Sequence, residues 1–160
     1  MGKDLHQLAL EVGDHLQTKN VKMVTAESCT GGWVAKVLTD IPGSSNWFER
    51  GFVTYSDAAK IESLGVGPQT LNVYGAVSEQ TVREMAEGAL KYSRGHVAVS
   101  ISGIAGPEGG SAHKPVGTVW IAWARVGSAT YAECHQFEGN RQMVRRQSVR
   151  VALQGVLGID

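Results

Sequence analysis

The sequence predicts an α/β fold: a single-domain layered α/β sandwich with a mixed β-sheet flanked by helices. Apolar residues recur at helical spacing near both ends of the chain, and short β-prone runs alternate with helical segments between them. Two further β-prone runs follow one another late in the chain, which adds an antiparallel pair to the alternating pattern. Because 160 residues fit one domain of ordinary size, we expect one domain over residues 1–160.

The N-terminal part is predicted to form a helix, a strand and a second helix. Leucine, alanine and valine side chains recur at helical spacing over residues 5–18, which is typical of an amphipathic helix. Residues 21–26 form a short β-prone run that breaks at the polar segment 27–32. A helical period resumes at Trp33 and lasts until Pro42, so the strand, the turn and the second helix form one unit.

The middle of the chain repeats this arrangement. Residues 48–55 are predicted to be a strand, and Ser56 then caps a short helix that ends at Gly65. Ser78 is predicted to cap a longer helix, because apolar residues flank it as a hydrophobic staple. A second polar turn therefore follows a strand.

The C-terminal part is predicted to add three strands and a closing helix. Residues 96–102 alternate like a strand and lead into the glycine-rich loop 103–110. Residues 116–126 and 129–137 are predicted to pair as a hairpin, and residues 141–157 to form the closing helix. With the earlier strands, these elements complete a mixed sheet.

Charge and hydropathy exclude several classes of protein. The 15 Lys and Arg residues balance 15 Asp and Glu residues, so we expect no broad basic surface and no nucleic-acid partner. No apolar run approaches the roughly 18 residues that a membrane span needs, and charged residues interrupt the N-terminus where a signal peptide would be apolar. Two cysteines cannot form a disulfide framework. We therefore expect a cytoplasmic protein that has no membrane partner.

The polar turn 27–32 is the first candidate catalytic segment. It leaves a strand and begins a helix, where unpaired backbone N–H groups and the helix dipole favour an anion or a developing oxyanion. Ser28 is the hydroxyl nearest to the strand end and could be a nucleophile, whereas Thr30 is better placed as the N-cap. Two alternatives stay open: Ser28 serves only the turn, or the nucleophile is Cys29, if its thiol is not simply buried.

A serine nucleophile needs a base, and the second polar turn offers one. Tyr55 ends a predicted strand, and Lys60 lies in the first turns of the following helix, so both could point into a cleft at the strand ends. A lysine desolvated in such a cleft has a lowered pKa and can act as a base. The alternative is a solvated lysine beside a packed tyrosine. The five histidines are predicted to be surface or structural residues.

Two further segments indicate a ligand site. Glycine accounts for 20 of the 160 residues, well above the roughly 7% typical of proteins, and the loop 103–110 fits close backbone contact with a small polar ligand. On the closing helix, Arg145 falls within the apolar arc, so its guanidinium needs an anionic partner, either a buried carboxylate or a ligand phosphate. No group of residues has the spacing of a metal site, so none is predicted.

Taken together, these segments resemble the C-terminal domain of the CinA family, in its stand-alone nicotinamide mononucleotide deamidase form. The resemblance spans nearly the whole chain and is carried by long motifs. They are TAESCTGGWVAKVLTDIPGSS, FERGFVTYSDAAK, GAVSEQTVREMA, SISGIAGPEGGSAHKPVGTVWIA and the arginine-rich closing helix.

The resemblance implies an amidohydrolase that converts nicotinamide mononucleotide to nicotinate mononucleotide and ammonia, in pyridine-nucleotide salvage, without a metal or other cofactor. The nucleophilic serine of the family matches Ser28, and its assisting tyrosine and lysine match Tyr55 and Lys60. The positions implied to contact the substrate are Thr30, Gly31, Gly32, Ser102, Gly103, Gly106 and Arg145. The family also suggests a homodimer.

The resulting hypothesis has Ser28 attack the amide carbon while Lys60, with Tyr55 relaying or positioning the proton, acts as base and then as acid. The backbone amides at Thr30–Gly32 are expected to hold the oxyanion. One alternative is a module that binds a nucleotide without hydrolysing it, in a competence or DNA-damage response. Another is a thiol enzyme that uses Cys29.

Overall fold

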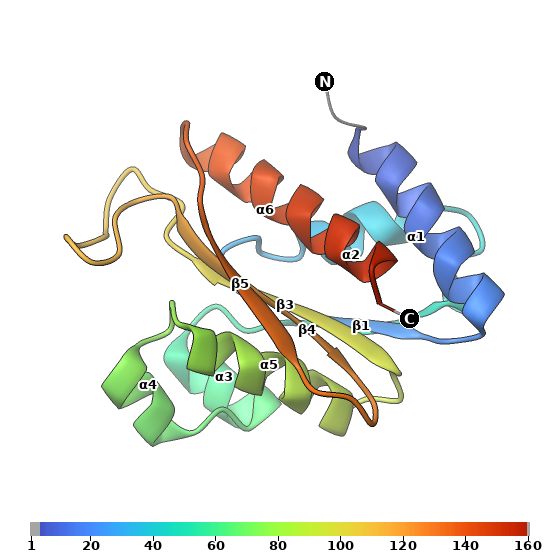
Figure 1. Ribbon diagram of the computed structural model, residues 1–160, viewed down its shortest axis with the longest axis horizontal. Coiled ribbons are helices and arrows are strands. Elements are labelled where there is room, and N and C mark those ends of the chain that lie inside the picture. Colours follow the sequence, from blue (N-terminus) through green and yellow to red (C-terminus); the bar gives the residue numbers. More distant parts are fainter. Residues whose placement is uncertain (1–3, 160) are drawn as a thin grey trace.

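The computed structural model describes residues 4–159 and contains a five-stranded sheet between two layers of helices (Figure 1). The strands follow the order β2-β1-β3-β4-β5. Their bounds are β1 (Met23–Glu27), β2 (Phe48–Val53), β3 (Val97–Gly103), β4 (Thr118–Arg125) and β5 (Tyr131–Gln136). Because β1 runs parallel to β2 and β3 while β4 and β5 are antiparallel, the predicted mixed sheet is confirmed.

The helices cover both faces of the sheet. One layer holds α1 (Leu5–Lys19), α2 (Trp33–Thr39) and α6 (Arg141–Leu157), and the other holds α3 (Asp57–Leu64), α4 (Pro68–Tyr74) and α5 (Glu79–Lys91) (Figure 1). A short 3-10 helix, η1 (Ser44–Asn46), precedes β2. None of the helices in the described part of the chain is long and apolar enough to span a membrane.

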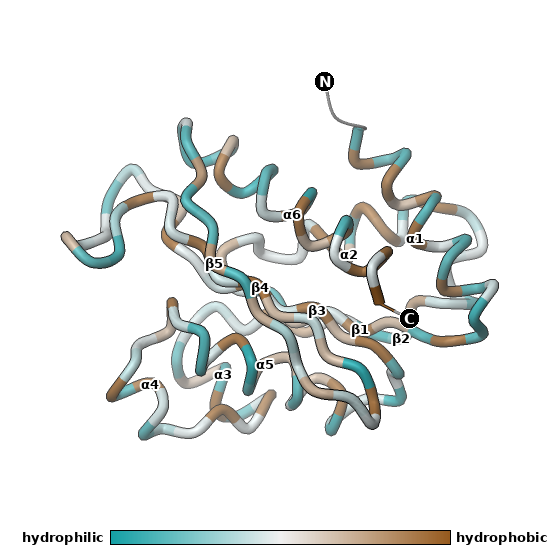
Figure 2. The backbone as a smooth tube through the Cα atoms, in the orientation of Figure 1, coloured by the Kyte–Doolittle hydropathy of each residue, from teal (hydrophilic) through white to brown (hydrophobic). Residues whose placement is uncertain are grey.

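The two faces of the central strand β3 differ in side-chain size. Val99 and Ile101 face the core formed with α1, α2 and α6, whereas Ala98 faces the core formed with α5. Small side chains on the second face let α5 pack closely, and the buried Ser100 hydroxyl donates a 2.6 Å hydrogen bond to the Val82 carbonyl of α5. Figure 2 shows this hydrophobic band along the central strands, between the helix layers.

Most predicted elements are present, with differences at their ends. The closing helix has the predicted bounds, and Ser56 and Ser78 cap α3 and α5 as expected, each accepting a hydrogen bond from a first-turn amide. The helix α4 and the turn η1 were not predicted. In α4 only Leu71 is buried, so its seven residues show no apolar period that the sequence could reveal.

The sheet brings three chain segments to one end. The carbonyl of Glu27 at the end of β1 accepts a 2.9 Å hydrogen bond from the Thr54 amide, just beyond β2. The Ser28 amide donates a 3.0 Å bond to the Ile101 carbonyl of β3. The turn that follows β1 therefore lies between the segment that follows β2 and the end of β3.

Candidate active site

Ser28 and Lys60 lie in direct contact at this end of the sheet. Ser28 follows β1 directly and is 7% exposed, and Lys60, in the first turn of α3, is 1% exposed. The Nζ of Lys60 is 2.9 Å from the Oγ of Ser28. It also lies 2.8 Å from the Thr54 carbonyl and 3.2 Å from the Tyr55 carbonyl. The alternative of a solvated Lys60 is therefore wrong.

The environment of Lys60 favours its neutral form. Burial lowers the pKa of Lys60 from its ordinary value of 10.5 and outweighs Asp57 and Cys29, which act in the opposite direction. All three hydrogen-bond partners of Nζ are neutral oxygens, and no described carboxylate forms an ion pair with it. A neutral amine can donate its two hydrogens to the two carbonyls and direct its lone pair at the Ser28 hydroxyl. This arrangement suits proton abstraction from Ser28.

Tyr55 meets the pair through its main chain. Its carbonyl accepts from Lys60 and lies 3.5 Å from the Ser28 Oγ. Its phenol is solvent-exposed, and the hydroxyl lies 3.2 Å from the Nη2 of Arg141 on α6. The structure thus brings Tyr55 to the site by its backbone, with the hydroxyl engaged by Arg141.

The Cys29 thiol is buried, and its environment does not suit a nucleophile. It is 6% exposed, and desolvation raises its pKa to about 11 despite the opposing charge of Arg145. A thiol with this pKa is protonated at neutral pH and is a poor nucleophile. Of the two candidate nucleophiles, the Ser28 hydroxyl and the Cys29 thiol, Ser28 is the one in contact with a base.

The residue that the sequence analysis overlooked is Glu27, whose carboxylate lies under the serine turn and is 1% exposed. It accepts hydrogen bonds from the amides of Val34 and Ala35 at the start of α2 and from the Thr30 hydroxyl. The prediction that Thr30 is the N-cap is wrong: Gly32 precedes the helix, and Glu27 supplies the capping oxygens from outside. The available signal was a carboxylate at the end of an otherwise apolar and threonine-bearing strand.

Some backbone N–H groups of the turn donate hydrogen bonds within the protein, and others do not. The Gly31 N–H donates a 3.0 Å hydrogen bond to the Ser28 carbonyl. The N–H groups of Cys29, Thr30 and Gly32 have no acceptor in another described residue. Gly31 and Gly32 adopt φ angles of 59° and 100°, which favour glycine, so the backbone conformation of this turn depends on both.

Arg145 holds the same turn from α6. Its Nε donates to the Cys29 carbonyl at 3.0 Å and its Nη2 to the Thr30 carbonyl at 3.3 Å, and the guanidinium lies over the Trp33 ring. Its partners are neutral carbonyls, so the buried carboxylate considered above is not found in residues 4–159. A hollow of about 370 Å³ adjoins it, lined by Thr30, Gly31, Gly32, Trp33, Lys36 and Arg145.

The glycine loop lies at the same end of the sheet. Gly106 has a φ of 81°, and its carbonyl accepts a 2.9 Å hydrogen bond from Arg141, the residue that also engages Tyr55. Ser102 is buried in β3. Packing explains the glycine at position 103, because a Cβ there would lie 2.6 Å from the Val119 side chain. The structure therefore places Gly106 at the rim of the site and gives Gly103 a role in the sheet.

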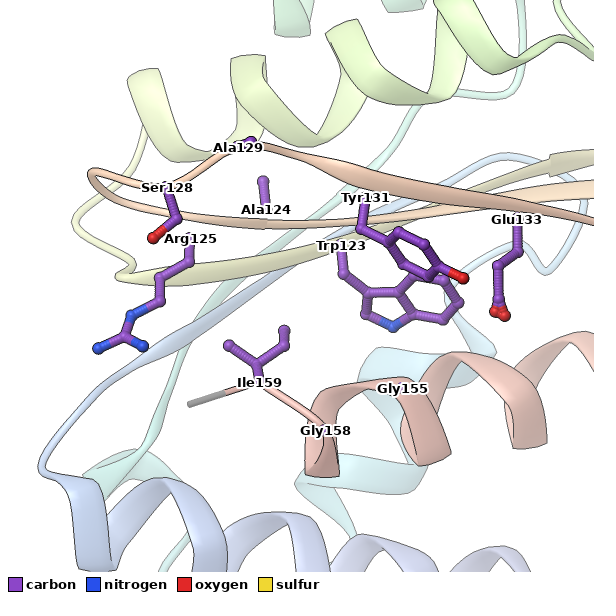
Figure 3. Close-up of a pocket in the computed structure, with 10 residues that line it drawn as sticks. All are labelled: Trp123, Ala124, Arg125, Ser128, Ala129, Tyr131, Glu133, Gly155, Gly158 and Ile159. Atoms are coloured by element: carbon purple, nitrogen blue, oxygen red, sulfur yellow. The ribbon is translucent and has the colours of Figure 1, made fainter.

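A separate cavity of about 470 Å³ lies at the opposite end of the sheet (Figure 3). Its wall includes Arg125, which pairs in register with Val97, the neighbour of Met23 where β1 begins. The rings of Trp123 and Tyr131 stack in it at a centroid distance of 5.9 Å. Ser28 follows the other end of β1, so this cavity takes no part in the Ser28 and Lys60 geometry.

Comparisons with known proteins give a consistent result. The family model for the CinA C-terminal domain matches residues 5–159. A nicotinamide-nucleotide amidohydrolase, PncC, from Shigella flexneri is 60% identical over 153 residues, which cover 94% of this chain and 92% of that protein. The Pseudomonas putida protein of that name is 51% identical over 150 residues, covering 94% and 93%. The crystal structure of the competence/damage inducible protein CihA from Agrobacterium tumefaciens superposes with a TM-score of 0.95 at 43% identity, covering 99% and 96%.

Proposed function

This chain belongs to the CinA C-terminal domain family, and from that membership and the Ser28 and Lys60 geometry we propose that it hydrolyses the carboxamide of a nicotinamide nucleotide. The family resemblance drawn from the sequence is confirmed. The relatives that it matches over more than nine-tenths of their length carry the name of nicotinamide-nucleotide amidohydrolase. The products are the nicotinate nucleotide and ammonia. The favoured substrate is nicotinamide mononucleotide.

The observation that carries the proposal is the 2.9 Å contact between a buried lysine amine and a serine hydroxyl. Neutral Lys60 takes the Ser28 proton as Oγ bonds to the amide carbon and the carbonyl electrons move onto oxygen. The resulting ammonium returns the proton to the amide nitrogen, which leaves as ammonia while the C–N bond breaks. Water, deprotonated by Lys60, then cleaves the Ser28 ester and releases the acid.

The oxyanion is held by the turn itself. The N–H groups of Cys29 and Thr30 have no acceptor in another described residue and belong to the residues that follow the nucleophile. The Gly31 amide, included in the expectation from sequence, is occupied by the Ser28 carbonyl. Each well-placed donor to an oxyanion contributes about 2.7–4 kcal/mol to transition-state stabilisation.

We assign the assisting role of Tyr55 to its carbonyl. This carbonyl and that of Thr54 accept the two hydrogens of neutral Lys60, which leaves the lone pair directed toward Ser28. The phenol, at the rim with Arg141, is available to contact the nucleotide rather than to relay a proton.

The phosphate end of the substrate is proposed to occupy the hollow beside Arg145. The guanidinium uses Nε and Nη2 for the turn, and its remaining nitrogen, with Lys36 and the Gly32 amide, offers donors to a phosphate. Ser102, Gly103 and Gly106 are proposed to form the other side of the substrate site, with Gly106 at its rim.

Cellular setting and assembly are parts of the same proposal. Cys29 and Cys134 are both free, which fits the reducing cytoplasm. Strand β5 has a single neighbour in the sheet and displays the exposed Tyr131, so its free edge is a surface on which a homodimer could form. Sedimentation equilibrium of the purified protein tests the homodimer.

Ammonia release from nicotinamide mononucleotide tests the proposed function, with free nicotinamide as the control substrate and no metal added. We expect release that requires the phosphoribosyl group. Tight binding of the nucleotide with no release of ammonia would contradict the proposal and favour the nucleotide-binding module.

A further inference from the structure

The side chain of Glu27 forms a closed set of hydrogen bonds beneath the serine turn. Its Oε1 accepts from the Thr30 hydroxyl at 2.7 Å and from the Val34 amide at 2.9 Å, and its Oε2 accepts from the Ala35 amide at 3.0 Å. In the described part of the chain no lysine or arginine forms an ion pair with it. A buried carboxylate thus has three donors and no cation.

Burial of a carboxylate is costly unless hydrogen bonds compensate for the lost water. Here two of the three donors are the first free amides of α2, and the positive end of that helix stabilises the negative charge. The remaining four residues of β1 are uncharged and fully buried, so packing alone would favour an uncharged residue at position 27 as well. The charge therefore has a local purpose in the turn.

The main chain of Glu27 is fixed as firmly as its side chain. Its carbonyl accepts from the Thr54 amide, and the next amide, of Ser28, donates to Ile101. The backbone on one side of Ser28 is thereby bound to two neighbouring segments, while the carboxylate reaches across the turn to Thr30 on the other side. Glu27 clamps both ends of the short segment that carries the nucleophile.

This clamp also decides which amides remain for the reaction. Because Glu27 occupies the Val34 and Ala35 amides, the start of α2 cannot receive the oxyanion. The amides of Cys29 and Thr30, which have no acceptor in another described residue, remain for this role. We propose that Glu27 is a positioning residue, which rests on the proposed function: it holds Ser28 at Lys60 and keeps the free amides of the turn directed at the reacting carbonyl.

The proposal predicts an effect on turnover rather than on substrate affinity. In Glu27→Gln the amide NH₂ group of the new side chain faces a donor, so one of the three bonds is lost and the turn relaxes. A misplacement of about 1 Å can cost about 100-fold in rate, so we expect kcat to fall by about 10- to 100-fold. The charged side chains of the hollow, Arg145 and Lys36, are retained in the variant, so we expect KM to stay within about threefold of the wild-type value.

The test compares Glu27→Gln, Thr30→Val and the Glu27→Gln/Thr30→Val double variant. Two readouts are measured: kcat and KM on nicotinamide mononucleotide, and the rate at which phenylmethylsulfonyl fluoride labels Ser28, followed by mass spectrometry. Glu79→Gln is the matched control, since it removes a partly exposed carboxylate from the first turn of α5. Circular dichroism confirms that each variant is folded.

We expect Glu27→Gln to lower kcat and the labelling rate by the same factor, and Thr30→Val to lower both as well. The double variant, which also loses the Thr30 bond to position 27, should lose more than Glu27→Gln alone, and Glu79→Gln should behave like the wild type. A Glu27→Gln protein with wild-type kcat and labelling rate would overturn the proposal. So would a loss that falls on KM alone.

The labelling readout separates this inference from the proposed function. If the wild type releases no ammonia but is labelled at Ser28, the proposed function fails, and slower labelling of Glu27→Gln still supports the clamp. If Ser28 of the wild type resists labelling and no ammonia is released, both fail, because there is no reactive serine to position.

Discussion

The Nζ of Lys60 lies 2.9 Å from the Oγ of Ser28, although 32 residues separate them in the chain. Parallel pairing of β1 with β2 brings the ends of both strands to one edge, where the Thr54 amide binds the Glu27 carbonyl. The Ser56 cap then sets where α3 begins, and hence which residue of its first turn faces Ser28. The contact thus follows from sheet register and from a helix cap.

Replacement of the nucleophile is expected to abolish turnover. Ser28→Ala removes the atom that attacks the amide carbon, so kcat for ammonia release should fall by at least about 1,000-fold. The nucleotide should still bind, with a dissociation constant near the wild-type value by calorimetry. Cys29→Ala is the matched control and should retain activity, because the Cys29 thiol is protonated at neutral pH. An inactive Cys29→Ala together with an active Ser28→Ala would show that Cys29, and not Ser28, is the nucleophile.

The pH dependence of the reaction is expected to report Lys60. Burial lowers its pKa, and the neutral amine is the active form. The value of kcat/KM should therefore rise by about tenfold per pH unit below this pKa and level off above it, well before the ordinary value of 10.5. Lys60→Met should remove the activity throughout the pH range. A profile of kcat/KM that is flat down to acid pH would show that no such base is involved.

Lys60→Met should also stabilise the protein at neutral pH. Since the pKa of Lys60 is lower in the folded than in the unfolded chain, the unfolded chain binds more protons between the two values. The stability of the wild type therefore rises with pH through that window. The variant has no such penalty, so its advantage in Tm should be greatest below the folded pKa and should shrink toward pH 10.5. An advantage that is independent of pH would contradict the assignment.

Tyr55→Phe is expected to retain most of the activity. The variant keeps the carbonyl that accepts from Lys60 and loses only the hydroxyl that lies on Arg141. We expect kcat to stay within about fivefold, because an exposed hydrogen bond contributes little. Arg141→Gln is the partner control and should show a similar change. A loss of several hundred-fold in Tyr55→Phe, absent from Arg141→Gln, would restore the phenol as a proton relay.

Arg145→Ala is expected to act on both the turn and the phosphate. Loss of the bonds to the Cys29 and Thr30 carbonyls should lower kcat for any substrate. Loss of a phosphate donor should raise KM for nicotinamide mononucleotide about tenfold more than for nicotinamide riboside, which lacks the phosphate. Steady-state kinetics on both compounds measure the difference. Equal increases in KM would leave Arg145 with its structural role alone.

Gly88→Ala is expected to destabilise the fold, although alanine is the better helix former. A Cβ at Gly88, inside α5, would lie 1.9 Å from the Leu64 carbonyl oxygen at the end of α3. Backbone cannot yield cheaply, so the overlap should cost about 1–3 kcal/mol in urea unfolding. Lys91→Ala, at an exposed position of the same helix, should change the stability by less than about 0.5 kcal/mol. A Gly88→Ala protein more stable than the wild type would show that α3 and α5 separate freely.

Elements with a strong periodic or capping signal could be predicted from the sequence. The bounds of α6 and the serine caps of α3 and α5 are local properties of a few neighbouring residues. The seven-residue helix α4 buries only Leu71 and forms where Pro68 follows Gly67, so no periodic signal was available. The site residues Ser28 and Lys60 were identified because polar turns that follow neighbouring strands meet at one edge.

The roles of individual groups in the site depend on side-chain and carbonyl orientations. The spacing of residues in the sequence does not reveal these orientations. Whether Tyr55 offers its phenol or its carbonyl depends on how the chain turns between β2 and α3, and Arg141 decides where the phenol lies. Likewise, Arg145 was correctly placed facing inward, but its partners are two carbonyls brought to it by the packing of α6 on the serine turn.

The sequence by itself determined the α/β class, the order of most elements and the two polar turns that supply Ser28 and Lys60, because these depend on periodicity and on local capping. Only the tertiary structure decided that Lys60 is desolvated, that the Cys29 thiol stays protonated, and that the Glu27 carboxylate occupies the start of α2. Protonation and hydrogen-bond choice follow from which atoms exclude water and which donors lie within 3 Å. Those neighbours come from strands and helices that are distant in the chain.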